Sequence, residues 1–289
     1  MKASQFLLLL FVSAIWGASH SLIRITVPEW GSAITTFLRI GIAAVTLTLL
    51  LMMMKKKLNF RDNFKQFFIV GFLNASFPIF LFAYAAKSLP ASYLVILNAS
   101  TPIFNAILSS LFLSDPFTIK KILGISLGIS GIVMLEQRGT IEHVDSVSGF
   151  AMACTLLASA CYGMSAVYLK KSERKVDPII LTAGSNVIGM MFLFPFAMNG
   201  DWHWTWNAAL PSILILGVLG SGFAFVIYYG LLQKIGAFRA SLSTFILPVF
   251  GLFWSWLFLD EIPNAYMMIG VVLIISATSL FLKRDPIQK

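Results

Sequence analysis

Apolar residues gather in ten long runs along this chain, and short polar stretches separate the runs. A helix needs about 20 apolar residues to cross the hydrocarbon core of a bilayer, and each run is close to that length. The pattern therefore predicts an all-α integral membrane protein with ten transmembrane helices. The runs cover residues 4–23, 31–53, 66–86, 89–113, 119–136, 147–169, 178–198, 208–232, 238–259 and 264–282.

The chain also repeats itself at an offset of 146 residues. Corresponding positions include Gly17 with Gly163, and Pro102 with Pro248. A self-match over this distance indicates a duplicated domain, because solenoid repeats are far shorter. Each half holds five runs, and an odd number makes the second half enter the membrane from the opposite side. The sequence therefore predicts two inverted five-helix repeats, at residues 1–138 and 147–283.

Composition and charge agree with a location in a lipid bilayer. Of the 289 residues, 58% are hydrophobic and 11% are charged, whereas soluble domains carry about 25% charged residues. The net charge of +9 is spread over short basic clusters between the apolar runs, so we expect no nucleic-acid partner. With the N-terminus in the cytoplasm, 17 of the 21 Lys and Arg residues fall on the cytoplasmic side. This asymmetry predicts that both termini are cytoplasmic.

Two prolines near the centres of their runs, Pro102 and Pro248, predict local breaks in helix geometry. A proline cannot donate to the carbonyl four residues earlier, which here belongs to Asn98 or Thr244. An unpaired carbonyl is costly in hydrocarbon, so each must face protein or a water-filled cavity. We interpret the prolines as kinks packed against a neighbouring helix or as cavity-lining breaks. Either interpretation is compatible with a hinge for alternating access.

Polar and aromatic residues near the bilayer centre predict a substrate pathway. Amides and hydroxyls at this depth either join helices or contact a polar substrate, and buried tyrosines also serve as packing residues. Arg39 is the one basic residue deep inside a run, and it either binds a substrate carboxylate or phosphate or satisfies neighbouring carbonyls. The candidate substrate-binding residues are Trp16, His20, Arg39, Asn74, Asn98, Thr101, Tyr162, Tyr228 and Thr244.

The acidic residues predict helix capping and give no support for proton coupling through a buried carboxylate. No Asp or Glu lies in the middle third of any predicted helix. Asp115 and the Asp260-Glu261 pair directly precede the runs 119–136 and 264–282. Because a carboxylate is favourable at a helix N-terminus, we expect these acids to cap the helices that follow them.

Enzyme motifs are missing from the sequence. The three histidines are dispersed, and there is no HExxH, CxxC, P-loop or nucleophile elbow. We therefore expect no enzymatic activity, no catalytic residue, no metal and no cofactor. Gly124 and Gly128 form a GxxxG pattern, which favours either close packing inside the chain or a homodimer.

Residues in both halves resemble the EamA-type branch of the drug/metabolite transporter superfamily. The resemblance rests on Trp16-Gly17, on Phe37-Leu38-Arg39 followed by Ala43, and on Pro248 to Glu261 with the partner segment Pro102 to Asp115. It covers nearly the whole chain as two successive domains. One departure is Asp115-Pro116, where the first half of the family usually has a Gly-Glu pair.

The resemblance implies a ten-helix bundle in a bacterial inner membrane, with a central cavity that opens alternately to either side. It implies a secondary transporter of small polar or amphipathic metabolites, either amino acid-like or drug-like, with export as the expected direction. The alternative is an importer or exchanger with the same fold, because the direction depends on gradients that the residues do not record.

Overall fold

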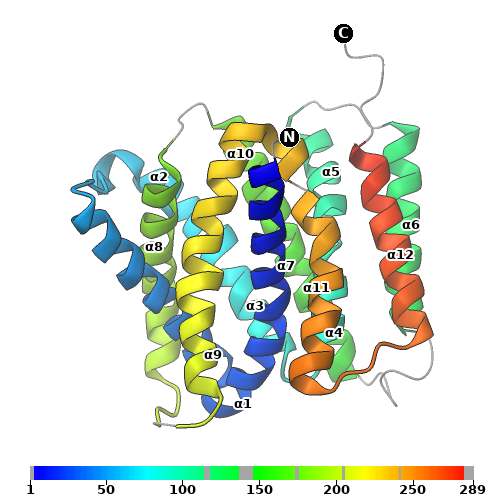
Figure 1. Ribbon diagram of the computed structural model, residues 1–289, viewed down its shortest axis with the longest axis horizontal. Coiled ribbons are helices and arrows are strands. Elements are labelled where there is room, and N and C mark those ends of the chain that lie inside the picture. The colour runs from blue at the N-terminus through cyan, green and yellow to red at the C-terminus, as the bar shows by residue number, and fades with distance from the viewer. Residues whose placement is uncertain are drawn as a thin grey trace.

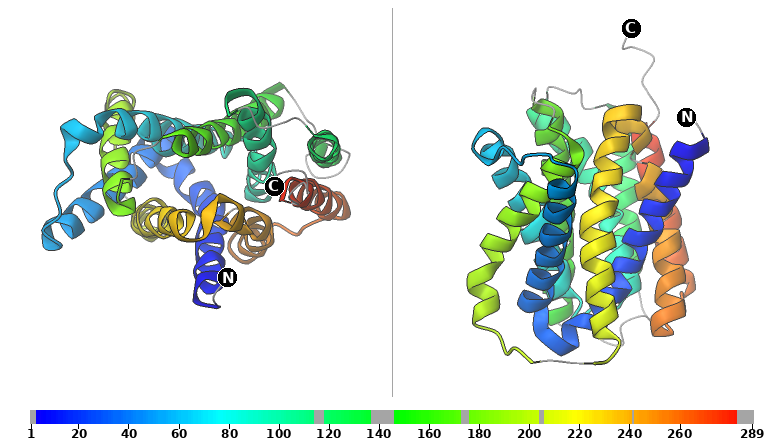
Figure 2. Two further views of the ribbon diagram at one scale, coloured as in Figure 1. Left: turned by 90° about the horizontal axis from the view of Figure 1, so that it is seen from above. Right: turned by 60° about the vertical axis from the view of Figure 1, so that its left-hand side comes forward.

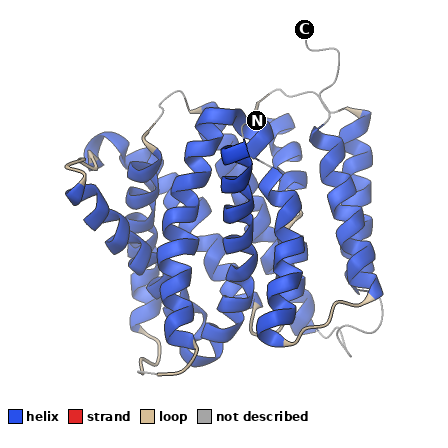
Figure 3. Ribbon diagram, viewed as in Figure 1, coloured by secondary structure: helices blue, strands red, loops and turns tan. Residues whose placement is uncertain are grey.

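The computed structural model describes residues 3–113, 118–136, 146–172, 176–203, 206–240 and 242–282. Within these ranges every regular element is a helix, and the helices stand side by side in one bundle (Figures 1 and 3). Their bounds are α1 (Ala3–Met53), α2 (Phe60–Val70), η1 (Gly71–Ser76), α3 (Phe77–Ala85), α4 (Ala91–Asn98), α5 (Thr101–Phe112), α6 (Ile119–Glu136), α7 (Ser146–Lys171), α8 (Pro178–Met198), α9 (Ala209–Ile215), η2 (Leu216–Phe223), α10 (Ala224–Ala240), α11 (Leu242–Leu259) and α12 (Ala265–Leu282).

The described helices have the length and composition of membrane spans. Stretches of at least 18 residues that are apolar enough to cross a bilayer are Ala3–Met53, Phe60–Ala85, Ala91–Phe112, Ser148–Lys171, Pro178–Met198 and Ala209–Ile235. Shorter apolar helices are Ile122–Gly131, Ile246–Leu259 and Ala265–Ala277. The predicted all-α membrane architecture is therefore confirmed for the described ranges, while the inverted ten-helix arrangement stays a prediction.

The first two predicted helices form one continuous element, α1, with a sharp reversal at Gly31. Gly31 has a φ of 68° and a ψ of 174°, a conformation that side-chain-bearing residues rarely adopt. The apolar pattern predicts that the first helix ends at residue 23. The helix continues past that point, and the guanidinium of the partly exposed Arg24 donates to the carbonyl of Ala86.

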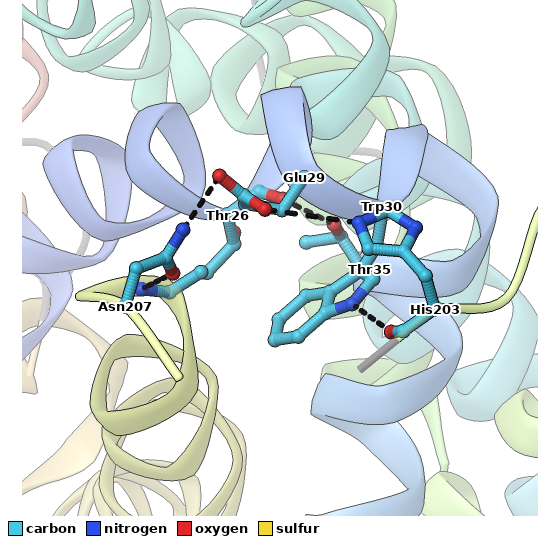
Figure 4. Close-up of polar contacts among 7 residues, drawn as sticks. Thr26, Glu29, Trp30, Thr35, His203 and Asn207 are labelled. Carbon is cyan, nitrogen blue, oxygen red and sulfur yellow. Dashed lines mark hydrogen bonds and ion pairs between the residues drawn. The ribbon is translucent and has the colours of Figure 1, made fainter. Parts of the chain in front are cut away.

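Polar contacts with the segment before α9 hold the reversal at Gly31 in place (Figure 4). Trp30 Nε1 donates to the carbonyl of His203 at 3.0 Å. The Glu29 carboxylate accepts from Asn207 Nδ2 at 2.7 Å and lies 3.7 Å from His203 Nε2. Two segments that are far apart in the sequence are thereby joined at one end of the bundle.

The predicted break at Pro102 is present, and the carbonyl it frees has a local partner. α4 ends at Asn98 and α5 begins at Thr101. The Thr101 hydroxyl donates to the main-chain carbonyl of Asn98 at 2.8 Å, so this carbonyl does not remain unpaired. Pro248 behaves differently, because it lies within the unbroken α11.

Two matched wide turns interrupt longer helices, and neither was predicted. Both are π-helices, η1 and η2, and the second starts 145 residues after the first. In η1 the hydroxyl of Ser76 donates to the carbonyl of Gly71 at 2.9 Å, and in both the next N–H reaches back five residues. π-helices are rare, and they are frequently found at functional sites.

Glycines bring α1 against α11 and α7 against α5 at corresponding positions. A Cβ placed on Gly17 would lie 2.8 Å from the backbone nitrogen of Gly251, and one on Gly163 would lie 2.9 Å from that of Asn105. Both pairs are related by the offset of 146 residues. The two crossings thus bring backbones into direct contact, which only glycine permits.

The GxxxG pattern of α6 is used at least in part inside the chain. A Cβ on Gly128 would overlap Ile103 Cδ1 of α5 and would lie 3.6 Å from Ala277 Cβ of α12. α6 and α12 pack together at one side of the bundle (Figure 2). Internal packing therefore accounts for Gly128, and a homodimer stays a prediction.

The predicted target of the Glu261 cap is wrong, because Glu261 caps a different helix. Its carboxylate accepts from the backbone N–H groups of Ala91 and Ser92, both at 2.8 Å, and so caps α4. The following helix, α12, is capped by Asn264, whose Oδ1 accepts from the N–H of Met267 at 2.9 Å. An acid satisfies whichever helix end lies nearest in space, and here that end belongs to the other half of the chain. Asp115 lies outside the described residues.

We predict that Gly17→Ala destabilises the protein. The added methyl group would overlap the backbone of α11, and overpacking of this kind costs about 1–3 kcal/mol. The melting temperature of the detergent-solubilised variant should fall by several degrees. Gly149→Ala is the matched control, since no atom lies within 4 Å of a Cβ placed there. An unchanged melting temperature for Gly17→Ala would contradict the close crossing.

We also predict that Glu261→Gln lowers the free energy of unfolding by about 1 kcal/mol. Glutamine keeps the size of the side chain but loses the charge and one of the two acceptor oxygens that bind the α4 N-terminus. Thermal unfolding in detergent is the measurement, and Asp260→Asn, at the exposed neighbouring position, serves as the control. Equal melting temperatures for the two variants would speak against the cap.

Candidate functional site

A cavity of about 160 Å³ lies in the middle of the bundle, between residues of both halves. The first half contributes side chains from α1, η1, α3, α4 and α5, and the second half contributes α7, α10 and α11. The cavity also reaches Leu169 and Leu232, one and two residues before the lysines Lys170 and Lys234. It therefore extends from mid-bundle toward the lysine-rich end.

Trp16 and His20 form one wall of the cavity from successive turns of α1. Trp16 Nε1 donates to the carbonyl of Gly220 at 3.2 Å, and its ring lies 5.0 Å from that of Phe225. His20 Nδ1 lies 3.1 Å from the carbonyl of Trp16, and Nε2 lies 3.5 Å from Asn98 Nδ2. A carbonyl only accepts and an amide nitrogen only donates, so the neutral Nδ1–H tautomer satisfies both contacts.

Arg39 reaches the cavity from the second part of α1. It is buried, with 5% of its surface exposed, and its Nε donates to Ser221 Oγ at 2.7 Å. The carbonyl of Ser221 in turn accepts from Asn186 Nδ2 at 3.2 Å. The wide turn η2 thus supplies neighbouring groups, the Gly220 carbonyl and the Ser221 hydroxyl, that orient Trp16 and Arg39.

Another part of the cavity lining combines an amide with aromatic rings. Asn74, in η1, donates from Nδ2 to the hydroxyl of Tyr229 at 2.7 Å. Tyr162 stacks on Phe82, with ring centroids 6.0 Å apart and planes 21° apart. Each π-helix therefore places or orients polar groups at the cavity, Asn74 in the first half and Ser221 in the second.

The structure brings most of the predicted site residues together. Lining the cavity are Trp16, His20, Arg39, Asn74, Asn98, Thr101, Tyr162 and Tyr228, together with the predicted hinge residue Pro102. The side chain of Thr244 lies outside the described residues. Pro248, in α11, is buried and is not among the residues that line the cavity. The substrate contacts and hinge roles assigned to these residues stay predictions.

Sequence reasoning missed residues whose surroundings give no local signal. Ser221 is a small residue in the glycine-rich run of η2, and only its bond to Arg39 reveals its importance. Phe82 looks like any apolar residue of a membrane helix, yet it packs edge-on against His20 at 5.2 Å. Ser165 lines the cavity, and its buried hydroxyl has no hydrogen-bond partner among the described residues.

The described part of the chain offers no cluster for a metal ion: no three His, Cys, Asp or Glu side chains there are grouped suitably. The chemistry that the cavity residues can perform is binding, by one guanidinium, amides, hydroxyls and aromatic faces. These groups can recognise a small molecule that has both a polar and an apolar part.

Comparison with known proteins agrees with this geometry. Curated relatives include the uncharacterized transporter YoaV of Bacillus subtilis, 26% identical over 268 residues and 91% of each chain. Another is Protein PagO of Salmonella typhimurium, 25% identical over 261 residues, which cover 86% of this chain and 83% of PagO. One crystal structure has the same fold, with a TM-score of 0.71, 15% identity and 97% coverage of both chains.

A family model describes nearly the whole chain in two successive matches, over residues 4–136 and 149–283. The helices of this chain also have the length and composition of membrane spans. The chain is therefore a multi-pass membrane protein that belongs to the EamA-like transporter family.

Proposed function

We propose that the chain is a secondary transporter that exports small polar or amphipathic metabolites, amino acid-like rather than drug-like, by alternating access. The observation that carries this proposal is the mid-bundle cavity, which residues of both halves line with polar and aromatic side chains. A site at the interface between repeats, near the bilayer midplane, is typical of transporters that work by alternating access.

The proposal includes ten transmembrane helices in two inverted repeats, at residues 1–138 and 147–283. One observation supports the two inverted repeats. A contact between a hydroxyl of one half and a carbonyl of the other half occurs twice, and the two halves exchange the roles of donor and acceptor. The Ser13 hydroxyl lies 3.1 Å from the carbonyl of Ser243, and the Ser159 hydroxyl lies 3.4 Å from that of Leu97. The two hydroxyls are 146 residues apart in the sequence, and so are the two carbonyls. This is the pattern expected of two halves related by a pseudo-two-fold axis.

Unequal burial of corresponding residues supports a cavity that opens at one end only. The large apolar cluster at the end near Gly31 combines residues from both halves. Three of its members are buried, whereas their counterparts at the other end are partly exposed: Leu22 against Tyr168, Leu81 against Ile227 and Leu89 against Ile235. If the tightly packed end loosened and the loosely packed end closed, the cavity would open to the other side.

The orientation follows from charge. Lysines cluster at the loosely packed end, both after α1 and in the last turn of α7, and basic residues favour the cytoplasmic side. We therefore place this end and both termini in the cytoplasm, and the chain in the inner membrane of a bacterium. In this state the cavity faces inward, ready to accept a substrate for export.

We predict that a cysteine at position 166 reacts with a membrane-impermeant maleimide only from the cytoplasmic side. Ala166 lines the cavity on α7, whereas Ala158 on the same helix is fully buried. In a background in which Cys154 and Cys161 are replaced by Ala, Ala166→Cys should be labelled in inside-out vesicles, and Ala158→Cys should not be labelled. Preferential labelling of Ala166→Cys in right-side-out vesicles would contradict the proposed orientation.

Flux in proteoliposomes tests the transport function. Vesicles loaded with a mixture of radiolabelled amino acids should lose at least one of them faster when they contain the protein. Asn98→Ala should slow this efflux about tenfold, the equivalent of one lost polar contact. Asn199→Ala is the matched control, because its exposed amide lies away from the cavity. Efflux equal to that of empty liposomes for every amino acid would refute the proposed substrate class.

A further inference from the structure

The guanidinium of Arg39 is built into the cavity wall with part of its hydrogen-bonding capacity unused. Its Nε is bound to Ser221 Oγ, and no described residue accepts a hydrogen bond from its two terminal nitrogens. Arg39 is nevertheless 95% buried, with 5% of its surface exposed, and it lines the cavity. A guanidinium has five donors and stays protonated in proteins. The terminal donors therefore face the space in which a substrate would lie.

The charge of Arg39 also has no counterpart in the described part of the cavity. None of the lining residues is Asp or Glu. The ion pairs Lys56–Asp177 and Glu29–His203 join partly exposed side chains elsewhere. Burying an unpaired charge is costly, because low-dielectric surroundings do not replace its hydration. A ligand with a negative group would remove this cost.

The surroundings of Arg39 fix its orientation. Ser221 is itself tied to α8 through Asn186, so the Nε of Arg39 points to a fixed acceptor. A Cβ placed on Gly220 would lie 3.4 Å from Arg39 Nη2 and 3.1 Å from Ser19 Oγ. Glycine at this position keeps the space beside the guanidinium open. With Nε occupied, the two terminal nitrogens present the planar pair of donors that a carboxylate binds in a bidentate manner.

The rest of the cavity suits an apolar body that carries small polar substituents. Its volume of about 160 Å³ limits the ligand to a small molecule. Its aromatic rings come from Trp16, Phe82, Tyr162, Phe225, Tyr228 and Tyr229. The polar groups other than Arg39 are amides, hydroxyls and the neutral imidazole of His20. They can bind an amino or hydroxyl substituent, but none of them replaces the positive charge.

We propose that Arg39 binds the carboxylate of the substrate, with Ser221 as its positioning residue, and that the substrate class is small amphipathic carboxylic acids, amino acids included. This inference rests on the proposed transport function, since it names the substrate class of the same cavity. It goes further by making one negative group a requirement for binding.

A set of linear six-carbon probes that differ in charge tests the carboxylate requirement. Hexanoate, norleucine, hexanamide and hexylamine are compared by equilibrium binding to the purified, full-length protein in nanodiscs. Hexanoate and norleucine should bind at least about tenfold more tightly than hexanamide or hexylamine. In Arg39→Gln the affinities for hexanoate and hexanamide should agree within about twofold. The proposal would be overturned if the unaltered protein bound the two carboxylates no more tightly than hexanamide and hexylamine, or if it bound neither carboxylate.

Controls separate binding from a structural role. Arg61→Gln makes the same substitution at an exposed site in α2 and should keep the preference for hexanoate. The melting temperature of ligand-free Arg39→Gln should be unchanged or higher, because the variant removes an unpaired buried charge. A clear loss of thermal stability, with the preference for carboxylates retained, would assign Arg39 to the fold instead.

The role of Ser221 has its own readout. Ser221→Ala should reduce the ratio of hexanoate to hexanamide affinity, and Ser221→Thr, which keeps the hydroxyl, should restore it. A ratio unaffected by Ser221→Ala would remove the positioning role.

Flux measurements distinguish failure of this inference from failure of the transport function. Carboxylate-selective binding that depends on Arg39, without protein-dependent flux, would refute transport and retain the site. Protein-dependent flux that does not distinguish hexanoate from hexanamide would retain transport and overturn the role of Arg39.

Discussion

Each main-chain polar group of a membrane helix needs a partner within the protein, and this requirement determines where the bundle departs from regular helix. The departures around the cavity are each matched by a side-chain donor. The Thr101 hydroxyl serves the Asn98 carbonyl, the Ser76 hydroxyl serves Gly71, and the Trp16 indole serves Gly220. The cavity lies where these exceptions meet, because irregular backbone is stable only where polar side chains can reach it.

The duplication supplies a common frame, and some of the positions at which the halves differ lie at the cavity. Glycine crossings recur at Gly17 and Gly163, which keeps the scaffold alike in both halves. At the cavity, by contrast, Arg39 in the first half corresponds to Ser185 in the second. A symmetric scaffold with an asymmetric lining can move as two equal parts and still hold a substrate in one orientation.

Much of the cavity was predictable because polar residues are rare in apolar runs. Asn74, Asn98 and Arg39 are conspicuous for that reason, and the structure places all of them at the cavity. The contacts of Ser221 and Glu261 were not predictable. Ser221 bonds to Arg39 across 182 positions in the sequence, and Glu261 reaches Ala91 across 170. Such pairings depend on how helices pack, and no spacing within one helix encodes them.

The π-helices give the cavity a means of adjustment that rigid helices lack. A π-turn differs from an α-turn by a single residue, and one residue corresponds to about 100° of rotation around a helix axis. Migration of the wide turn along η1 would therefore swing Asn74 around the helix, while the segments on either side keep their positions. Such a shift would change which side chain of η1 faces the cavity without moving the helices around it.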